Sequence, residues 1–365
     1  MKIILFYHSL LSDWNHGNAH FLRGFATELI LRGNDVHIYE PENSWSYNNL
    51  IKDTGNKYIN EFEKYYPLLS STRYKEDEFN FSDILKDADL VIVHEWNTHS
   101  LVKKISDYKK HHKHFKLLFH DTHHRALSEP DKMNKYDLSG YDGVLAFGKV
   151  IKDIYVKRGF KAFVWHEAAD TNIFKPITSE KTGDIVWIGN WGDEERTNEI
   201  FNYFIEPVQR LKLKAAVYGV RYPDEAIKKL NDTGIEYKGY IPNFMVPQVF
   251  SQYRLTVHIP RRPYVEHLHG IPTIRPFEAL ACGIPLISKY WNDVEHLFTN
   301  NEFIYANSNE QMGESITKVL NNDSLRNELI KNGLSTIREK HNCVVRVDEL
   351  LSIYDSLKIK SKIIV

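Results

Sequence analysis

Short apolar runs of strand length alternate with amphipathic helical segments along the chain, and this alternation most restricts the possible fold. Residues 3–7 form the first such run, and Phe21, Phe25 and Leu29 then share one helical face before the helix stops at Gly33. Uninterrupted apolar strands separated by helices are typical of parallel sheets covered on both faces. We therefore predict an α/β chain. Further strands are expected in the first half at residues 36–39, 89–93, 116–119, 144–147 and 162–165.

The same pattern restarts after Pro176, with expected strands at residues 184–188, 215–218, 255–259 and 284–287. A chain of 365 residues exceeds one ordinary core and suits two domains. We place the boundary near residues 176–182, which gives Rossmann-like domains over 1–176 and 177–340. A last amphipathic helix within 341–365 is expected to pack back on the first domain.

The composition argues against several classes of protein. Lys and Arg number 47 and Asp and Glu 48, a net charge of -1, so no basic stripe favours a nucleic-acid partner. Two cysteines, Cys282 and Cys343, are too few for a disulfide framework or a cysteine metal cluster. No apolar run approaches the ~18 residues that span a bilayer, and the first residues lack a secretory pattern. We expect a cytoplasmic protein without a strong membrane signal.

The segment from Pro276 to Pro285, Pro-Phe-Glu-Ala-Leu-Ala-Cys-Gly-Ile-Pro, resembles the donor-binding segment of GT-B glycosyltransferases. The longer run from His269 to Glu278 is similar to the CgeB-like, group 1 branch of that superfamily. Residues 168–176 resemble its interdomain segment, and residues 188–191 with Arg196 its first glycine loop of the C-terminal domain. In the first half the similarity is looser and involves residues 16–18, His120 and Arg125.

This resemblance implies a GT-B fold, in which two Rossmann-like parallel-sheet domains face each other across a cleft. The first domain is then the acceptor side, and the second binds a nucleoside-diphosphate sugar. A UDP-sugar is the expected donor, and neither a cofactor nor a metal is expected. In open parallel sheets ligands bind beyond the carboxyl ends of the strands, so the loops there carry the candidate residues.

Glu278 is the main candidate for the donor site. Pro276 suits the first helical position, which places Glu278 in the first turn. A carboxylate there can accept hydrogen bonds from two vicinal ribose hydroxyls. The alternative is a carboxylate that stabilises its own helix, but a capping box needs Ser or Thr where Arg275 stands.

Residues 270–273 are expected to hold the diphosphate through the backbone N–H groups of Gly270, Ile271 and Thr273. A rigid turn between strand and helix is the alternative. The resemblance also shows a departure, because retaining members often carry a Glu that contacts the donor sugar at the position of Gly270. Here that contact must come from backbone groups, from neighbours such as Glu266 or His269, or be absent.

Cations and backbone groups complete the expected donor site. Arg196 and Arg261, with Arg262, are candidates to stabilise the leaving diphosphate, a role that needs no metal; a solvated surface role is the alternative. Tyr240 and Ile241 match the region that frames the nucleobase, and a core role is equally credible for Ile241.

Histidines are the expected catalytic residues of the first domain. By resemblance His120 contacts the donor sugar, and imidazole can handle a proton near neutral pH. His16 is a base candidate on the acceptor side. A metal site at His120, Asp121 and His123 has the right ligand types but matches no known spacing. A loop of satisfied polar side chains is the remaining alternative.

Two loops are expected to line the acceptor cleft. One carries Asn15 and Gly17, whose missing side chain permits close backbone approach. The other carries His94 and Trp96, a sugar-stacking candidate for which core packing is the commoner fate.

The prediction is a metal-independent glycosyltransferase, hexosyl or related, acting with retention on a hydroxyl acceptor. That acceptor is a glycan, a small molecule or modified DNA. The alternatives are a non-catalytic nucleotide-sugar-binding coat or assembly protein, and a nucleotide-sugar epimerase on the same fold.

Overall fold

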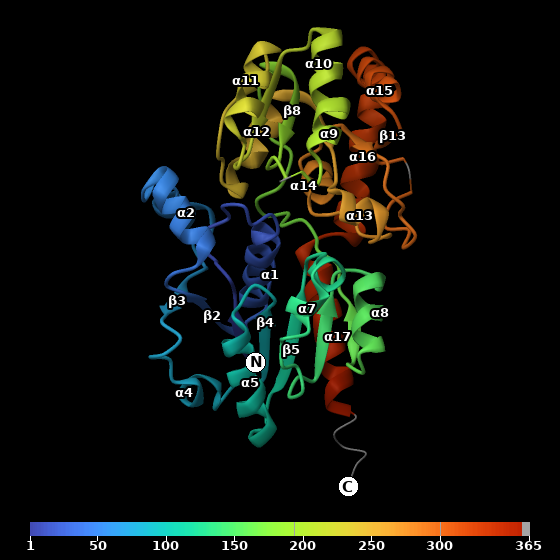
Figure 1. Cartoon of the computed structure of the whole chain (residues 1–365). Coiled ribbons are helices and arrows are strands. Elements are labelled where there is room, and N and C mark those ends of the chain that lie inside the picture. Colours follow the sequence, from blue (N-terminus) through green and yellow to red (C-terminus); the bar gives the residue numbers. More distant parts are fainter. Residues whose placement is uncertain (193, 300, 360–365) are drawn as a thin grey trace. The chain divides into compact units, whose positions relative to one another are not determined.

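The computed structural model describes residues 1–192, 194–299 and 301–359, and Figure 1 traces its elements along the chain. These residues form two compact units. The first unit comprises Met1–Glu167 and the helix that begins at Cys343, and the second comprises Ala168–Asn342. The stretch 168–176, expected at the end of the first domain, is therefore part of the second unit.

A seven-stranded parallel sheet forms the centre of the first unit, in the order β3-β2-β1-β4-β5-β6-β7. Its inner strands are almost entirely buried because helices cover them, which explains their continuous apolar sequences. The strands are β1 (Lys2–Phe6), β2 (Asp35–Pro41), β3 (Ser71–Tyr74), β4 (Leu90–His94), β5 (Lys116–Asp121), β6 (Gly143–Ala146) and β7 (Ala162–Val164).

Helices flank this sheet (Figure 1). Two of them follow a capping residue, Ser44 before α2 and Thr98 before α5, whose side chain accepts a backbone hydrogen bond. The helices are α1 (Ala19–Leu31), α2 (Trp45–Thr54), α3 (Lys57–Tyr65), α4 (Phe81–Leu85), α5 (His99–His111), α6 (Arg125–Ser128), α7 (Pro130–Met133), α8 (Lys149–Lys157) and α17 (Cys343–Ile359).

The last helix, α17, packs on α1 within the first unit. Val347 and Leu350 are fully buried there. The indole N–H of Trp165 donates to the carbonyl of Arg346 at 2.9 Å, and Arg32, directly after α1, pairs with Asp348 at 2.5 Å. The C-terminal segment is therefore a structural part of the N-terminal unit.

The second unit has a six-stranded parallel sheet in the order β10-β9-β8-β11-β12-β13. The strands are β8 (Gly183–Ile188), β9 (Ala215–Tyr218), β10 (Glu236–Tyr237), β11 (Tyr253–His258), β12 (Leu286–Lys289) and β13 (Ile304–Ala306). Around it lie α9 (Thr197–Ile200), the π-helix η1 (Phe201–Ile205), α10 (Glu206–Leu211), α11 (Asp224–Asp232), the 3₁₀-helix η2 (Asn243–Met245), α12 (Val246–Ser251), α13 (Arg262–Glu266), α14 (Arg275–Ala281), α15 (Asn309–Asn321) and α16 (Asp323–Lys340).

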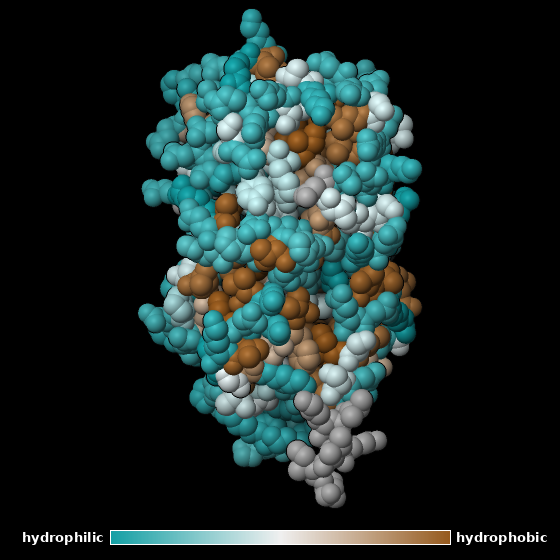
Figure 2. All heavy atoms as spheres, turned by 90° about the vertical axis from the view of Figure 1, so that its right-hand side faces the viewer, coloured by the Kyte–Doolittle hydropathy of each residue, from teal (hydrophilic) through white to brown (hydrophobic). Residues whose placement is uncertain are grey.

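Among the described residues, no helix combines the length and apolarity that a bilayer crossing needs. On the face shown in Figure 2, hydrophobic residues are interspersed with hydrophilic ones. Large exposed hydrophobic side chains such as Leu31 and Val156 are a normal part of such a surface.

A buried ion pair ties the first strand loop to α1. The guanidinium of Arg23 contacts the Asp13 carboxylate at 2.6 Å, and both side chains are almost inaccessible to water. The Nε of Arg23 also donates to the carbonyl of Leu10 at 2.9 Å, and the ring of Phe62 lies 5.0 Å from its Cζ. The pair therefore holds the loop after β1, which belongs to the ligand-facing edge of the sheet.

We predict that Arg23→Met destabilises the protein by about 3–5 kcal/mol, because it leaves the Asp13 carboxylate buried without its cation. Urea unfolding followed by circular dichroism measures this change. Lys64→Met, which removes an exposed pair with Glu61, is the matched control and should leave the transition unchanged. Equal effects of the two substitutions would show that the buried pair has no special role.

Candidate functional site

The loops at the carboxyl ends of β8, β9 and β10 are joined by backbone hydrogen bonds. The N–H of Gly189 donates to the carbonyl of Tyr218, and that of Gly219 to the carbonyl of Gly239, both at 2.9 Å. A Cβ on Gly219 would lie 2.2 Å from the Gly189 carbonyl oxygen, so only glycine permits this approach. These contacts make the three loops one surface at the ligand-binding edge of the sheet.

Tyr240 and Ile241 follow β10, and both are half-buried. Strand β10 is the edge strand, and two strands separate it from β11. The structure therefore places the expected base-framing residues at one end of the carboxyl edge. The other donor-site candidates lie near β11, β12 and α14.

Arg196 connects the loop after β8 to the end of β11. Its two terminal nitrogens donate to the carbonyls of Asn190, at 2.5 Å, and Ile259, at 3.1 Å. Burial lowers its pKa to about 9, and neighbouring Arg261 adds to that effect. None of the described carboxylates forms an ion pair with Arg196. Its side chain nevertheless stays positively charged at neutral pH, and backbone carbonyl dipoles stabilise that charge.

Arg261 stands at the carboxyl end of β11, directly before α13. Its guanidinium contacts the Glu195 carboxylate at 3.0 Å, and the side chain stays partly exposed. The adjacent Arg262 pairs with Glu199 at 3.4 Å. Arg261 is thus held by a carboxylate just before α9, and Arg262 by one within α9.

Glu278 lies in the first turn of α14 with its side chain fully buried. Its carboxylate forms an ion pair with Arg275, three residues earlier on the same helix. The helix begins at Arg275, one residue before the predicted start at Pro276, and its N-cap is Ile274 without a side-chain hydrogen bond, so no capping box forms. A ribose hydroxyl that approached Glu278 would therefore compete with Arg275 for the same oxygens.

His258 connects β11 to the loop before α14. Its ring nitrogens lie 2.8 Å from the Ser288 hydroxyl and 3.1 Å from the Thr273 hydroxyl. Burial lowers the pKa of His258 to about 3, with further contributions from Arg196 and Arg275. A neutral imidazole and two guanidinium groups therefore occupy one region, which favours an anionic ligand.

Two of the three backbone donors expected for a diphosphate are already engaged. The N–H of Gly270 donates to the Asn292 carbonyl at 2.7 Å, and that of Ile271 to the Leu268 carbonyl at 3.2 Å. Thr273, whose φ is +59°, is close to His258 instead. In this conformation the N–H groups of Gly270 and Ile271 stabilise a rigid turn between strand and helix, which was the alternative interpretation of residues 270–273.

Glu295 is a residue of this region that sequence reasoning missed. It follows β12, and its side chain lies against Gly270. A Cβ at Gly270 would come within 2.7 Å of Glu295 Cγ and 2.8 Å of its Oε1. A carboxylate from another loop thus occupies the space beside the glycine that departs from the family pattern.

Three histidines of the first unit lie together at the carboxyl ends of β1, β4 and β5. His94 and His120 are register partners on β4 and β5, with ring centroids 5.5 Å apart. The His16 ring lies 5.8 Å from that of His94. Burial lowers the pKa of His120 to about 3 and holds the pKa values of His16 and His94 well below the usual range. All three are therefore neutral imidazoles at physiological pH.

Glu95 and Asp121, directly after His94 and His120, are both fully buried. Burial raises the pKa of Glu95 well above its usual range, and Asp121 raises it further. The Tyr155 hydroxyl donates to Asp121 at 2.6 Å, and Arg125 lies 3.6 Å from Glu95. The sequence places both carboxylates where buried strands end, since Glu95 directly follows β4 and Asp121 is the last residue of β5.

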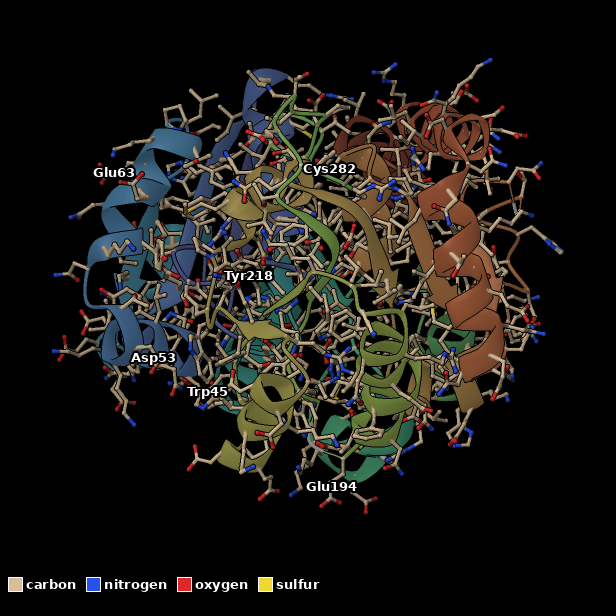
Figure 3. The ribbon with its side chains drawn as sticks, turned by 90° about the horizontal axis from the view of Figure 1, so that it is seen from above. Trp45, Asp53, Glu63, Glu194, Tyr218 and Cys282 are labelled. Carbon is tan, nitrogen blue, oxygen red and sulfur yellow. The ribbon has the colours of Figure 1, made fainter. Side chains whose placement is uncertain are left out.

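Aromatic side chains line the same edge of the first unit. Trp96 is 40% exposed, and the Cζ of Arg125 lies 4.3 Å from its ring centroid. Trp14 packs edge-on against Trp45 with centroids 5.0 Å apart and donates its indole N–H to Asp53 at 2.6 Å. Figure 3 labels Trp45 and Asp53, both on α2. Trp96 therefore offers an accessible ring of the kind that stacks on sugars.

The loop of residues 12–18 includes the remaining acceptor-side candidates. Asn15 has a φ of +49°, and Gly17 is exposed. The side-chain amide of Asn18 donates to the Thr122 hydroxyl at 2.6 Å, which ties this loop to the end of β5. In the described parts of the chain, no group of three or more His, Cys, Asp or Glu is arranged to hold a metal ion.

Comparisons with known proteins agree with this arrangement. Residues 196–352, which include Arg196, Arg261 and Glu278, match a family model described as glycosyl transferase-like. No curated protein sequence matches the chain.

Solved structures resemble the whole chain at low sequence identity. Sucrose-phosphate synthase from Thermosynechococcus elongatus is 12% identical, with a TM-score of 0.64 over 98% of this chain and 99% of that one. Anabaena HepE in complex with UDP and glucose is 12% identical, with a TM-score of 0.66 over 98% and 100%. The T4 phage BGT in complex with UDP and Mn²⁺ is 15% identical, with a TM-score of 0.61 over 98% and 99%. The chain therefore has the GT-B glycosyltransferase fold, and its C-terminal half carries a glycosyl transferase-like sequence.

Proposed function

We propose that this protein transfers a glycosyl group, a hexose or a related sugar, from a UDP-sugar to a hydroxyl acceptor. The observation that carries the proposal is the grouping of Glu278, Arg275, Arg196 and His258 at the carboxyl edge of the second sheet. It combines a buried carboxylate ion-paired with Arg275 and a second cation, Arg196, held by backbone carbonyls, inside the segment that matches the family model. The structural relatives in complex with UDP support a uridine nucleotide as donor.

In this proposal the second unit binds the donor. Glu278 accepts hydrogen bonds from the ribose hydroxyls once Arg275 turns toward the ligand. Arg196 and Arg261 stabilise the charge that develops on the leaving diphosphate, so the reaction proceeds without a metal. Tyr240 and Ile241 frame the base, and Thr273 contributes to the diphosphate site. Retention and the CgeB-like branch are parts of the same proposal.

The first unit then provides the acceptor side. His120 addresses the donor sugar, and Trp96 stacks on the acceptor. Asn15, Gly17 and the His16 loop complete that surface. The neutral state of the three buried histidines is the form in which an imidazole can accept a proton.

We predict that UDP raises the melting temperature of the wild-type protein by several degrees. Ligand at 100 times its Kd adds about 2.7 kcal/mol to the state that binds it, a shift of this order. Glu278→Gln should lower the affinity for UDP by roughly 10- to 100-fold, because hydrogen bonds to a charged group contribute about 1.5–3 kcal/mol. Differential scanning fluorimetry with UDP, GDP and their sugars measures both effects.

Glu314→Gln, on the exposed face of α15, is the control and should bind UDP as the wild type does. Absence of any shift with all nucleotides would refute the donor site. Binding without transfer or donor hydrolysis over a wide acceptor panel would instead point to a non-catalytic nucleotide-sugar-binding protein. Conversion of the donor without acceptor would point to an epimerase.

We predict that Arg261→Gln weakens UDP binding about 10-fold and leaves uridine binding unchanged, because only UDP presents a diphosphate to the cation. Isothermal titration calorimetry with both ligands tests this difference. Lys228→Gln removes an exposed cation of α11 and serves as control for a general loss of charge. Equal weakening of UDP and uridine would place Arg261 outside the diphosphate site.

A further inference from the structure

Thr122 is the centre of a buried hydrogen-bond network that the predicted site did not include. Its hydroxyl oxygen lies 2.6 Å from the amide nitrogen of Asn18, 3.1 Å from Glu95 Oε1 and 3.1 Å from His94 Nε2. Its backbone N–H also donates to Glu95 Oε1, at 2.8 Å. A hydroxyl can donate one hydrogen bond and accept two. The direction of each of these hydrogen bonds therefore limits the directions of the others.

The directions of these hydrogen bonds determine the tautomer of His94. The Asn18 amide nitrogen can only donate, and Glu95 Oε1 already accepts from the Thr122 N–H, so it accepts from the hydroxyl as well. The Thr122 oxygen is then left as an acceptor toward His94. The proton of the neutral imidazole therefore resides on Nε2, and Nδ1 carries the lone pair.

The lone pair on Nδ1 of His94 also indicates that a ligand binds here. His94 is fully buried, and its Nδ1 has no hydrogen-bond partner among the described residues. A buried nitrogen without a partner costs free energy, which a ligand that donates a hydrogen bond can recover. His94 ends β4 at the carboxyl edge of the sheet, where ligands of such folds bind.

We propose that His94 is the base that takes the proton of the acceptor hydroxyl, and that Thr122 and Glu95 position its ring for this step. The proposal rests on the proposed glycosyl transfer. The acceptor O–H bond breaks and its proton passes to Nδ1 while the oxygen bonds to the anomeric carbon on the face that the diphosphate leaves, so that the configuration is retained. The bond from that carbon to the diphosphate oxygen breaks, and the diphosphate leaves with the electron pair.

Burial and the groups around the ring lower the pKa of His94 and so keep its imidazole neutral, the form that can accept a proton. The resulting imidazolium keeps its Nε2 proton on Thr122, whose hydroxyl proton remains on Glu95. The groups that face the ring are His16 and His8 from the β1 side, His120 from β5 and Arg125 from α6. The His94 ring is fully buried, and a base closed to water limits wasteful hydrolysis of the donor.

The decisive measurement is the tautomer of His94 in the whole protein, read from the ¹⁵N chemical shifts of labelled histidine. The spectrum of His94→Gln assigns the signal. We expect His94 to carry its proton on Nε2 in the wild type and in Thr122→Ser. In Thr122→Val, which keeps the shape of the side chain but lacks the hydroxyl, His94 should no longer favour the Nε2–H tautomer. An Nδ1–H form in the wild type would overturn the proposal.

Transfer kinetics with UDP-glucose over a panel of hydroxyl acceptors provide the second test. His94→Gln should lower kcat by about 10²- to 10⁴-fold, as for other general bases, with the affinity for UDP unchanged. Thr122→Val should lower kcat in part, and Thr122→Ser should restore it. His111→Gln, on the exposed end of α5, is the matched control.

The failures of the two proposals can be told apart. A wild type that neither binds nucleotides nor transfers sugar refutes the transferase itself. An active wild type whose kcat survives His94→Gln refutes only the role of His94.

Discussion

Burial of both faces of the two parallel sheets is the constraint on which the rest of the structure depends. Strand β4, for example, consists of buried apolar residues up to its last position, so its polar side chain lies where the strand ends. His94 and His258 are both the last residue of a buried strand. Each is neutral because of burial, and each forms hydrogen bonds with hydroxyl groups of neighbouring segments. The same packing that stabilises the sheet thus places polar side chains at its carboxyl edge.

Much of this architecture could be predicted from the sequence, because continuous apolar runs are a local signal. The central strands were found within a residue or two of their bounds, and the GT-B fold followed from the resemblance. Strands β3, β10 and β13 were not anticipated. Ser71–Tyr74 and Glu236–Tyr237 are short and largely polar, and β3 and β10 lie at sheet edges, where one side stays unpaired and burial is weaker.

The sequence indicated which residues belong to the candidate site, but it indicated less well which groups these residues contact. The motif around Glu278 identified it as a candidate. Its ion pair with Arg275 could not be predicted in the same way, because it depends on side-chain conformation within one helix turn. The engagement of the Gly270 amide by Asn292, and the place of Glu295 beside that glycine, join loops distant in sequence. Sequence patterns report what a segment buries, whereas these contacts depend on which loops the sheet order brings together. The roles of the site residues stay predictions until ligands are bound.

The return of α17 to the first unit affects how the chain can acquire its structure. The helix covers α1 and accepts the Trp165 indole hydrogen bond, so the first unit lacks part of its core until residue 343 and its successors are available. The second unit, in contrast, is continuous from Ala168 to Asn342. During synthesis from the N-terminus, the second unit can therefore complete its fold while the first still waits for its last helix. Domains of this kind reverse the usual order in which the N-terminal unit is finished first.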